Sequence, residues 1–144
     1  YFLIWLKYNP SMENKAEKLS LLADLVAVIR ADHKIDEKEM VFLETIARQF
    51  GFDAQVLESI LTAEVPFVPP RNESERILQF HRMVLLMNID DEHHSEELKT
   101  IKELGLRLGL SPFAIERVLK IMNRFEDRIV PPDVMIDIFK TYYN

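Results

Sequence analysis

Apolar residues recur at helical spacing along almost the whole chain, and no alternating strand pattern persists. The first stripe, from Leu19 to Ile29, predicts a helix over about 15–31. Leu21 and Leu25 belong to a second apolar face, which places this helix in the core. Six further stripes follow before the C-terminus. The pattern therefore predicts an all-α fold, a compact bundle of about seven helices.

Capping residues and helix breakers divide the chain between these helices. Asp36 is an expected N-cap, and Glu39 three residues later completes a capping box. Ser111 followed by Pro112 opens another helix, because proline is tolerated at the first helical position. The other expected starts are Asp53, Asn72, Ser95 and Asp133, and the expected stops are Gly51, Gly109 and the proline-rich stretches at 65–70 and 130–132.

The second half of the chain repeats the first at an offset of 58 positions, the distance from Gly51 to Gly109. At this offset caps fall on caps and apolar positions fall on apolar positions, without a gap. A Val-Pro-Pro breaker also recurs near the end of each copy. Such agreement indicates an internal repeat. We expect two pseudo-symmetric three-helix repeats, at about 19–70 and 77–132, that share one core and are followed by a C-terminal helix.

The N-terminal segment, residues 1–11, differs from the helical domain expected over 12–144. Its first eight residues are apolar except for Lys7, but this is far fewer than the roughly 20 that span a bilayer. It also lacks the basic region and cleavage site of a signal peptide. Three interpretations stay open: an arm packed on the domain or on a second copy as a homodimer contact, sequence added by cloning or gene assignment, or the end of a membrane anchor. Exposed apolar octamers favour aggregation unless covered, which favours the first two.

Composition narrows the functional classes. The chain has 144 residues, of which 48% are hydrophobic and 29% charged, an ordinary globular mixture. It has no cysteine, which excludes disulfides, thiolate metal sites and thiol nucleophiles. The formal net charge of −6 argues against nucleic acid and is compatible with cations or basic partners. We expect a cytoplasmic protein without direct membrane insertion.

The acidic stretches between helices are the sharpest candidate for chemistry. The candidate metal ligands are Asp32, Asp36, Glu39, Asp90, His94 and Glu97. In each copy an aspartate precedes a glutamate by seven residues, and hard cations need several convergent oxygens. The spacing is not that of an EF-hand, because lysine and leucine stand where that loop needs acids. Helix capping is the alternative, and it accounts fully for Asp36 and Glu39 but less well for the two leading aspartates.

Other motifs add little. The adjacent His93 and His94 point in different directions on a helix start, and without cysteine a closed zinc site is not expected. His81, near an apolar helix face, is interpreted as a partly buried packing residue. The sequence has no glycine-rich phosphate loop, no Ser/His/Asp set and no His-Glu-x-x-His motif. The chain is therefore expected not to be an enzyme.

The stretch from Ala31 to Glu39, followed by residues 46–52, resembles the TerB-like family, which is named for tellurite-resistance proteins and is similar to the N-terminal domain of the DjlA co-chaperone. Ala31, Asp32, Ile35 and Glu39 match the family pattern of Ala-Asp-Gly, an aliphatic residue and a fixed glutamate, whereas His33 replaces the glycine. The resemblance covers about 19–122. It implies an all-helical domain with an acidic surface, associated with metal binding or with scaffolding in stress-linked membrane complexes.

The leading expectation is thus a non-enzymatic interaction or scaffold domain of TerB-like type. Its acidic loops would contact a protein partner, with a divalent cation as an optional ligand. Two alternatives stay open: an enzyme with a carboxylate-lined groove between the repeats, and a regulatory domain of a membrane-associated protein.

Overall fold

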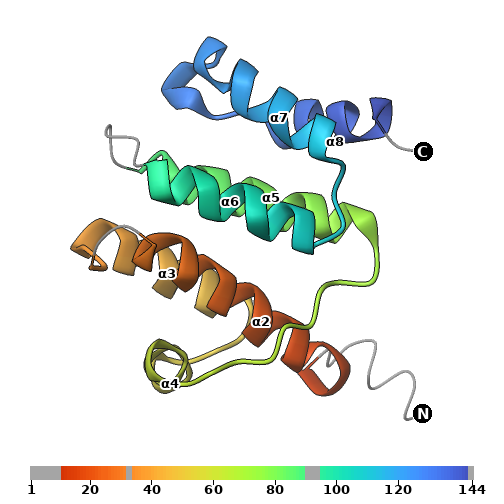
Figure 1. Cartoon of the computed structure of the whole chain (residues 1–144). Coiled ribbons are helices and arrows are strands. Elements are labelled where there is room, and N and C mark those ends of the chain that lie inside the picture. Colours follow the sequence, from red (N-terminus) through yellow and green to blue (C-terminus); the bar gives the residue numbers. More distant parts are fainter. Residues whose placement is uncertain (1–10, 32–33, 90–94, 143–144) are drawn as a thin grey trace.

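A computed structural model describes residues 11–31, 34–89 and 95–142, and within these ranges the chain forms only helices and loops. In these ranges seven α-helices are joined by short connections (Figure 1). They are α2 (Ser11–Arg30), α3 (Glu37–Gln49), α4 (Ala54–Thr62), α5 (Glu73–Met87), α6 (Ser95–Arg107), α7 (Pro112–Ile121) and α8 (Pro132–Thr141), with two short 3-10 helices, η1 (Met122–Arg124) and η2 (Glu126–Arg128), between α7 and α8. The predicted all-α fold of about seven helices is confirmed.

Helix α2 lies between α4 and the α5–α6 pair and is largely buried, as its two apolar faces predict. Leu22, Leu25 and Ile29 are fully buried on it. It packs against α3, α4, α5 and α6, so it contacts neighbours on several sides. Burying apolar surface on every side is what an all-round hydrophobic helix requires.

The helices stack in three layers (Figure 1). α2 and α3 form one layer, with α4 on its outer side; α5 and α6 form the middle layer; α7 and α8 form the last. Phe80 of α5 meets Phe139 of α8 edge to face, with 5.8 Å between ring centroids. Gly105 allows α6 to approach α5 and α7 closely, because a Cβ there would lie 2.8 Å from Ile115 Cδ1 and 3.2 Å from the Phe80 ring.

The predicted caps hold the helix ends. Asp36 Oδ1 accepts a hydrogen bond from the Glu39 backbone N–H at 2.8 Å, and Glu39 Oε1 accepts one from the Asp36 N–H at 3.1 Å. The side chains of Asp53, Asn72 and Ser111 each accept a hydrogen bond from a backbone N–H three residues on. Gly51 and Gly109 follow α3 and α6 with φ of +84° and +83°, the left-handed conformation that favours glycine.

Three boundaries differ from the prediction. α2 begins at Ser11 rather than near residue 15, because its polar first turn has no apolar stripe to reveal it. α6 includes Ser95 as its first residue instead of its cap, and α8 begins at Pro132 rather than at Asp133. The 3-10 turns after α7 were not predicted; Asp127 and Arg128 there have φ of 55° and 58°.

Helix boundaries coincide with the register of the proposed repeat. α3 and α6 have 13 residues each, and they begin at residues 37 and 95, which are 58 positions apart. α4 and α7 begin at 54 and 112, again 58 apart. The apolar residues 1–10 lie outside the described residues. None of the described helices is long and apolar enough to cross a membrane.

Candidate functional site

The acidic loops are only partly described. Asp36 and Glu39 bond to each other's backbone as a capping box, and Glu39 is only 3% exposed. Its counterpart Glu97 on α6 is also 3% exposed. Asp32, Asp90 and His94 lie outside the described residues. Within the described ranges, no group of three or more histidine, aspartate or glutamate residues is placed to hold a metal ion. Among the described candidate ligands, the structure shows Asp36 and Glu39 together in the capping role, and the metal site stays a prediction.

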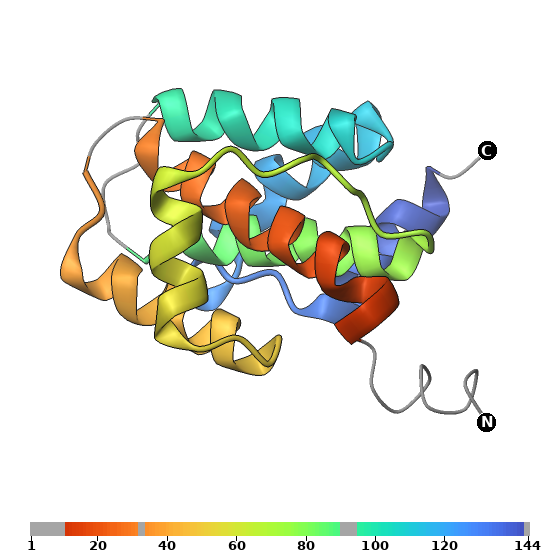
Figure 2. The same ribbon diagram turned by 90° about the horizontal axis from the view of Figure 1, so that it is seen from below.

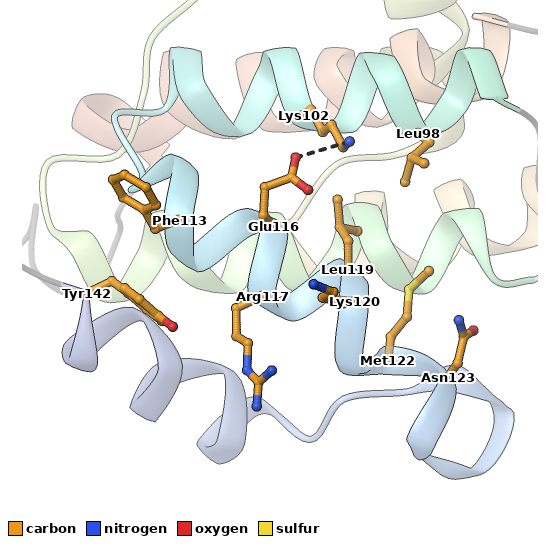
Figure 3. A pocket seen from close by; sticks show the side chains of 10 residues that line it. All are labelled: Leu98, Lys102, Phe113, Glu116, Arg117, Leu119, Lys120, Met122, Asn123 and Tyr142. Carbon is orange, nitrogen blue, oxygen red and sulfur yellow. Dashed lines mark ion pairs between the residues drawn. The ribbon is translucent and has the colours of Figure 1, made fainter.

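An open groove of about 650 Å³ runs along α7, away from the capping box of α3 (Figure 3). Half of its lining residues lie on α7, with α6 on one side and η1 and the residue that follows α8 on the other. The lining residues are Leu98, Lys102, Phe113, Glu116, Arg117, Leu119, Lys120, Met122, Asn123 and Tyr142. We call this feature the α7 groove.

Large apolar side chains are exposed at one end of the α7 groove. Phe113, in the first turn of α7, is 73% exposed, and Tyr142, just after α8, is 39% exposed. Figure 3 shows both at the same end of the groove. Leu106 on α6 is 51% exposed and lies one helical turn after Lys102. In contrast, Leu119 and Met122 in the lining are mostly buried. Two exposed aromatic side chains therefore lie at the same end of the groove.

Cations predominate among the charges of the α7 groove. Lys102, Arg117 and Lys120 line it, together with a single carboxylate, that of Glu116. Lys102 Nζ lies 3.1 Å from Glu116 Oε1, and both side chains are exposed, so the pair contributes only about 0–1 kcal/mol. Arg117 and Lys120 are exposed and have no ion-pair partner among the described residues. The groove is thus locally positive, although the chain carries a formal net charge of −6.

Outside the α7 groove, residues 64–70 cross α2 as an extended segment (Figure 2). We call it the strap. The Val68 backbone N–H donates to Ser20 Oγ of α2 at 2.8 Å. The Arg107 guanidinium of α6 lies 4.0 Å from the centroid of the Phe67 ring, a cation–π contact. These contacts fix the strap against both helices, which supports the structural role expected for its prolines.

Asp24 lies one turn after Ser20 on α2 and is 7% exposed. Its Oδ2 has no hydrogen-bond partner among the described residues. Burial raises the pKa of this carboxyl from 3.8 to about 7, and the charge of Arg107 opposes that rise. Asp24 is therefore a poorly compensated buried acid, which destabilises the fold when it is ionised.

His81 has the packing role that the sequence indicated. It is half-buried on α5, and its Nε2–H donates to the Val130 carbonyl oxygen at 2.8 Å. Burial lowers the pKa of the imidazole, and the hydrogen bond to Val130 partly opposes this. The neutral side chain thus ties α5 to the segment that precedes α8.

Comparisons with protein-family models, with curated proteins and with solved structures found no match for this chain. The resemblance to the TerB-like family therefore stays a prediction from the residues that carry it.

The sequence analysis did not identify the α7 groove. A signal was present, because Phe113 lies outside the inward stripe of α7 formed by Ile115, Val118 and Leu119. An aromatic residue off the buried stripe of an amphipathic helix is expected to be exposed. The contributions of Lys102 and Tyr142 carried no such signal, since α6 and α8 meet α7 only in the folded chain.

Proposed function

We propose that this chain is a non-enzymatic protein-interaction domain, of the TerB-like type that its sequence resembles, and that it contacts its partner through the α7 groove. The observation that carries the proposal is the exposure of Phe113, 73% of whose surface is accessible, at the rim of this groove. A large aromatic side chain in water forgoes about 1.5–3 kcal/mol of burial free energy, which a partner could recover.

The chemistry of the groove fits a protein partner. Aromatic residues and arginine are the side chains most often responsible for binding energy at protein interfaces, and the groove has Phe113, Tyr142 and Arg117. The groove is open to solvent along its length rather than enclosed, whereas small-molecule sites usually bury most of their ligand.

The enzyme alternative gains no support from this site. It needs several carboxylates in an apolar cleft that shifts their pKa values. The α7 groove has one carboxylate, Glu116, which is exposed and paired with Lys102. The groove is also lined by α6, α7, η1 and α8, rather than by both proposed repeats.

Four further parts of the proposal come from the sequence. The cytoplasm is the proposed location, and a link to stress responses follows the TerB-like resemblance. A homodimer through the apolar N-terminal segment and a divalent cation at the acidic loops stay separate hypotheses. Neither depends on the α7 groove, so each can fail without affecting the main proposal.

The test is chemical crosslinking and affinity capture from extracts of the native cells, with three versions of the chain. These are the wild type, Phe113→Gln, and Val41→Gln as the matched control, because Val41 on α3 is also an exposed apolar residue, at 55%. We expect one protein to be captured by the wild type and by Val41→Gln. Its recovery should fall by about 30-fold with Phe113→Gln, the size of an interface hot spot.

Thermal melts of all three versions show whether the variants fold equally well. Capture that is the same with Phe113→Gln as with the wild type would overturn the proposal, as would the absence of any protein whose capture depends on Phe113.

A further inference from the structure

We infer that the α7 groove binds an acidic, amphipathic helical segment of the partner protein. This inference rests on the proposed function, since it names the chemistry of the partner at the same groove. It is carried by charge complementarity and by the spacing of the exposed groups along α7.

The charges of the groove are opposite in sign to those of the chain. The chain has 24 acidic and 18 basic residues, whereas the groove lining has three cations and one carboxylate. An acidic segment would be repelled by much of the molecule and attracted here, which guides it to one place. Arg117 and Lys120 offer their charges without a competing ion pair among the described residues.

The spacing of the groups favours a helical partner. Phe113, Arg117 and Lys120 stand at positions i, i+4 and i+7 of α7, so they lie along one face about one turn apart. One helical turn is about 5.4 Å. A partner helix with acidic residues at the same spacing can meet both cations while an apolar side chain packs on Phe113. Grooves of this kind take the apolar face of an amphipathic helix.

Other occupants fit less well. A nucleic-acid backbone would meet the carboxylate of Glu116 in the lining, and the protein around the groove is acidic. The N-terminal segment of this chain, residues 1–10, is apolar but contains no acidic residue, so it cannot match the cations. A second copy of the chain has acidic helices and is therefore an outcome that the experiment must separate.

The experiment is selection from a display library of random peptides of about 16 residues, a little over four helical turns. Selection is done in parallel on three proteins. They are the wild type, the groove variant Phe113→Gln/Arg117→Ser/Lys120→Thr, and the control Val41→Gln/Arg48→Thr. Arg48 is matched to Lys120, because each is an exposed cation in the last turn of its helix.

The expected result is enrichment of peptides with Asp or Glu and large apolar residues at helical spacing, on the wild type and on the control alike. An enriched peptide, synthesised with a fluorescent label, should bind the groove variant at least tenfold more weakly, about the loss of 1.4 kcal/mol. Its affinity for the wild type should fall as salt is raised.

Four outcomes would overturn the inference: no enrichment, enrichment of neutral or basic peptides, equal binding to the groove variant, or groove-dependent binding of a labelled oligonucleotide. Self-association that sedimentation detects in the wild type and not in the groove variant would make a second copy the occupant, which also overturns it. The proposed function is judged separately. If a native protein is captured through Phe113 but its crosslinked segment has no acidic residues, the function stands and the inference fails.

Discussion

The helix pairs α3–α4 and α6–α7 share their register and nearly share their lengths, but their surfaces differ. Position 113 in α7 corresponds to 55 in α4 at the offset of 58, and the residues there are Phe113 and Gln55. At the same offset, Ser59 and Thr62 of α4 correspond to Arg117 and Lys120 of α7. Ser59 and Thr62 donate their hydroxyl hydrogens to backbone carbonyls of their own helix. The face of α4 is therefore neutral and polar where that of α7 is aromatic and cationic.

The difference separates residues that form the fold from residues available for binding. At buried positions the two pairs agree: Leu43 matches Ile101 and Leu57 matches Ile115, all nearly or fully buried. At exposed positions they diverge, and α7 has an exposed aromatic ring and two cations where α4 has uncharged polar residues. Since exposed apolar and charged groups contribute little to stability, the exposed residues of α7 are free to serve a partner.

The largest expected effect on stability comes from the buried apolar residues that the two helix pairs have in common. Leu43→Ala and Ile101→Ala should each lower the free energy of unfolding by about 2–5 kcal/mol, because both side chains are fully buried and their truncation leaves a cavity. Urea titration followed by circular dichroism measures the change. Both variants should unfold in a single transition, as expected of one shared core. Two separate transitions would show instead that the halves are independent.

The next largest effect on the free energy of unfolding is expected from Asp24, the buried acid on α2. The pKa of Asp24 is about 7 in the folded chain, above its ordinary value of 3.8, so the folded state holds this proton more tightly than the unfolded state. The stabilising contribution is present below pH 3.8 and is lost as the pH rises to about 7. Asp24→Asn should therefore resemble the wild type at pH 4 and exceed its stability at pH 8, by roughly 2–4 kcal/mol.

Urea titrations of both proteins between pH 4 and pH 8 measure this difference. The counterpart of Asp24 on α5 is Arg82, a half-buried cation that donates to Gln79 Oε1 at 3.2 Å and lies 5.1 Å from the centroid of the Phe50 ring. Asp24 has no comparable partner at Oδ2 among the described residues. A stability difference that does not change with pH would show that the Asp24 carboxyl titrates normally.

The sequence predicted the parts of this molecule that depend on local signals. Caps such as Asp53 and glycine stops such as Gly109 act within a few residues, so their pattern was sufficient to place most helices. The start of α2 at Ser11 was missed, because its first turn is polar. The α7 groove depends on which helices meet, and neither Lys102 nor Tyr142 signals its neighbour on α7. The predicted metal ligands Asp36 and Glu39 have a capping role, and that role too was read from the sequence.

A smaller effect on stability, but a large one on binding, is expected from exchanging the exposed residues of the two pairs. Phe113→Gln/Arg117→Ser/Lys120→Thr gives α7 the residues of α4, and the free energy of unfolding should change by no more than about 0.5 kcal/mol per substitution. Binding of the selected acidic peptide should be lost, as fluorescence anisotropy would show. A marked drop in melting temperature would mean that these side chains support the fold, and the separation of roles would not hold.

The last comparison concerns the helix caps at the starts of α3 and α4. Asp36→Ala and Asp53→Ala should each lower the free energy of unfolding by about 1 kcal/mol, because each removes an acceptor for a backbone N–H at a helix start. If Asp36 acts only as a cap, both losses will be the same with and without chelator.

An ion that binds at the acidic loops would instead stabilise the wild type, by about 2.7 kcal/mol at 100 times its dissociation constant. Melts with calcium, magnesium, manganese and zinc, repeated on Asp32→Asn and Asp90→Asn, test this directly. A shift for one ion that Asp36→Ala and Asp32→Asn abolish, but Asp53→Ala retains, would make the loop before α3 a cation site, and Asp36 a ligand as well as a cap.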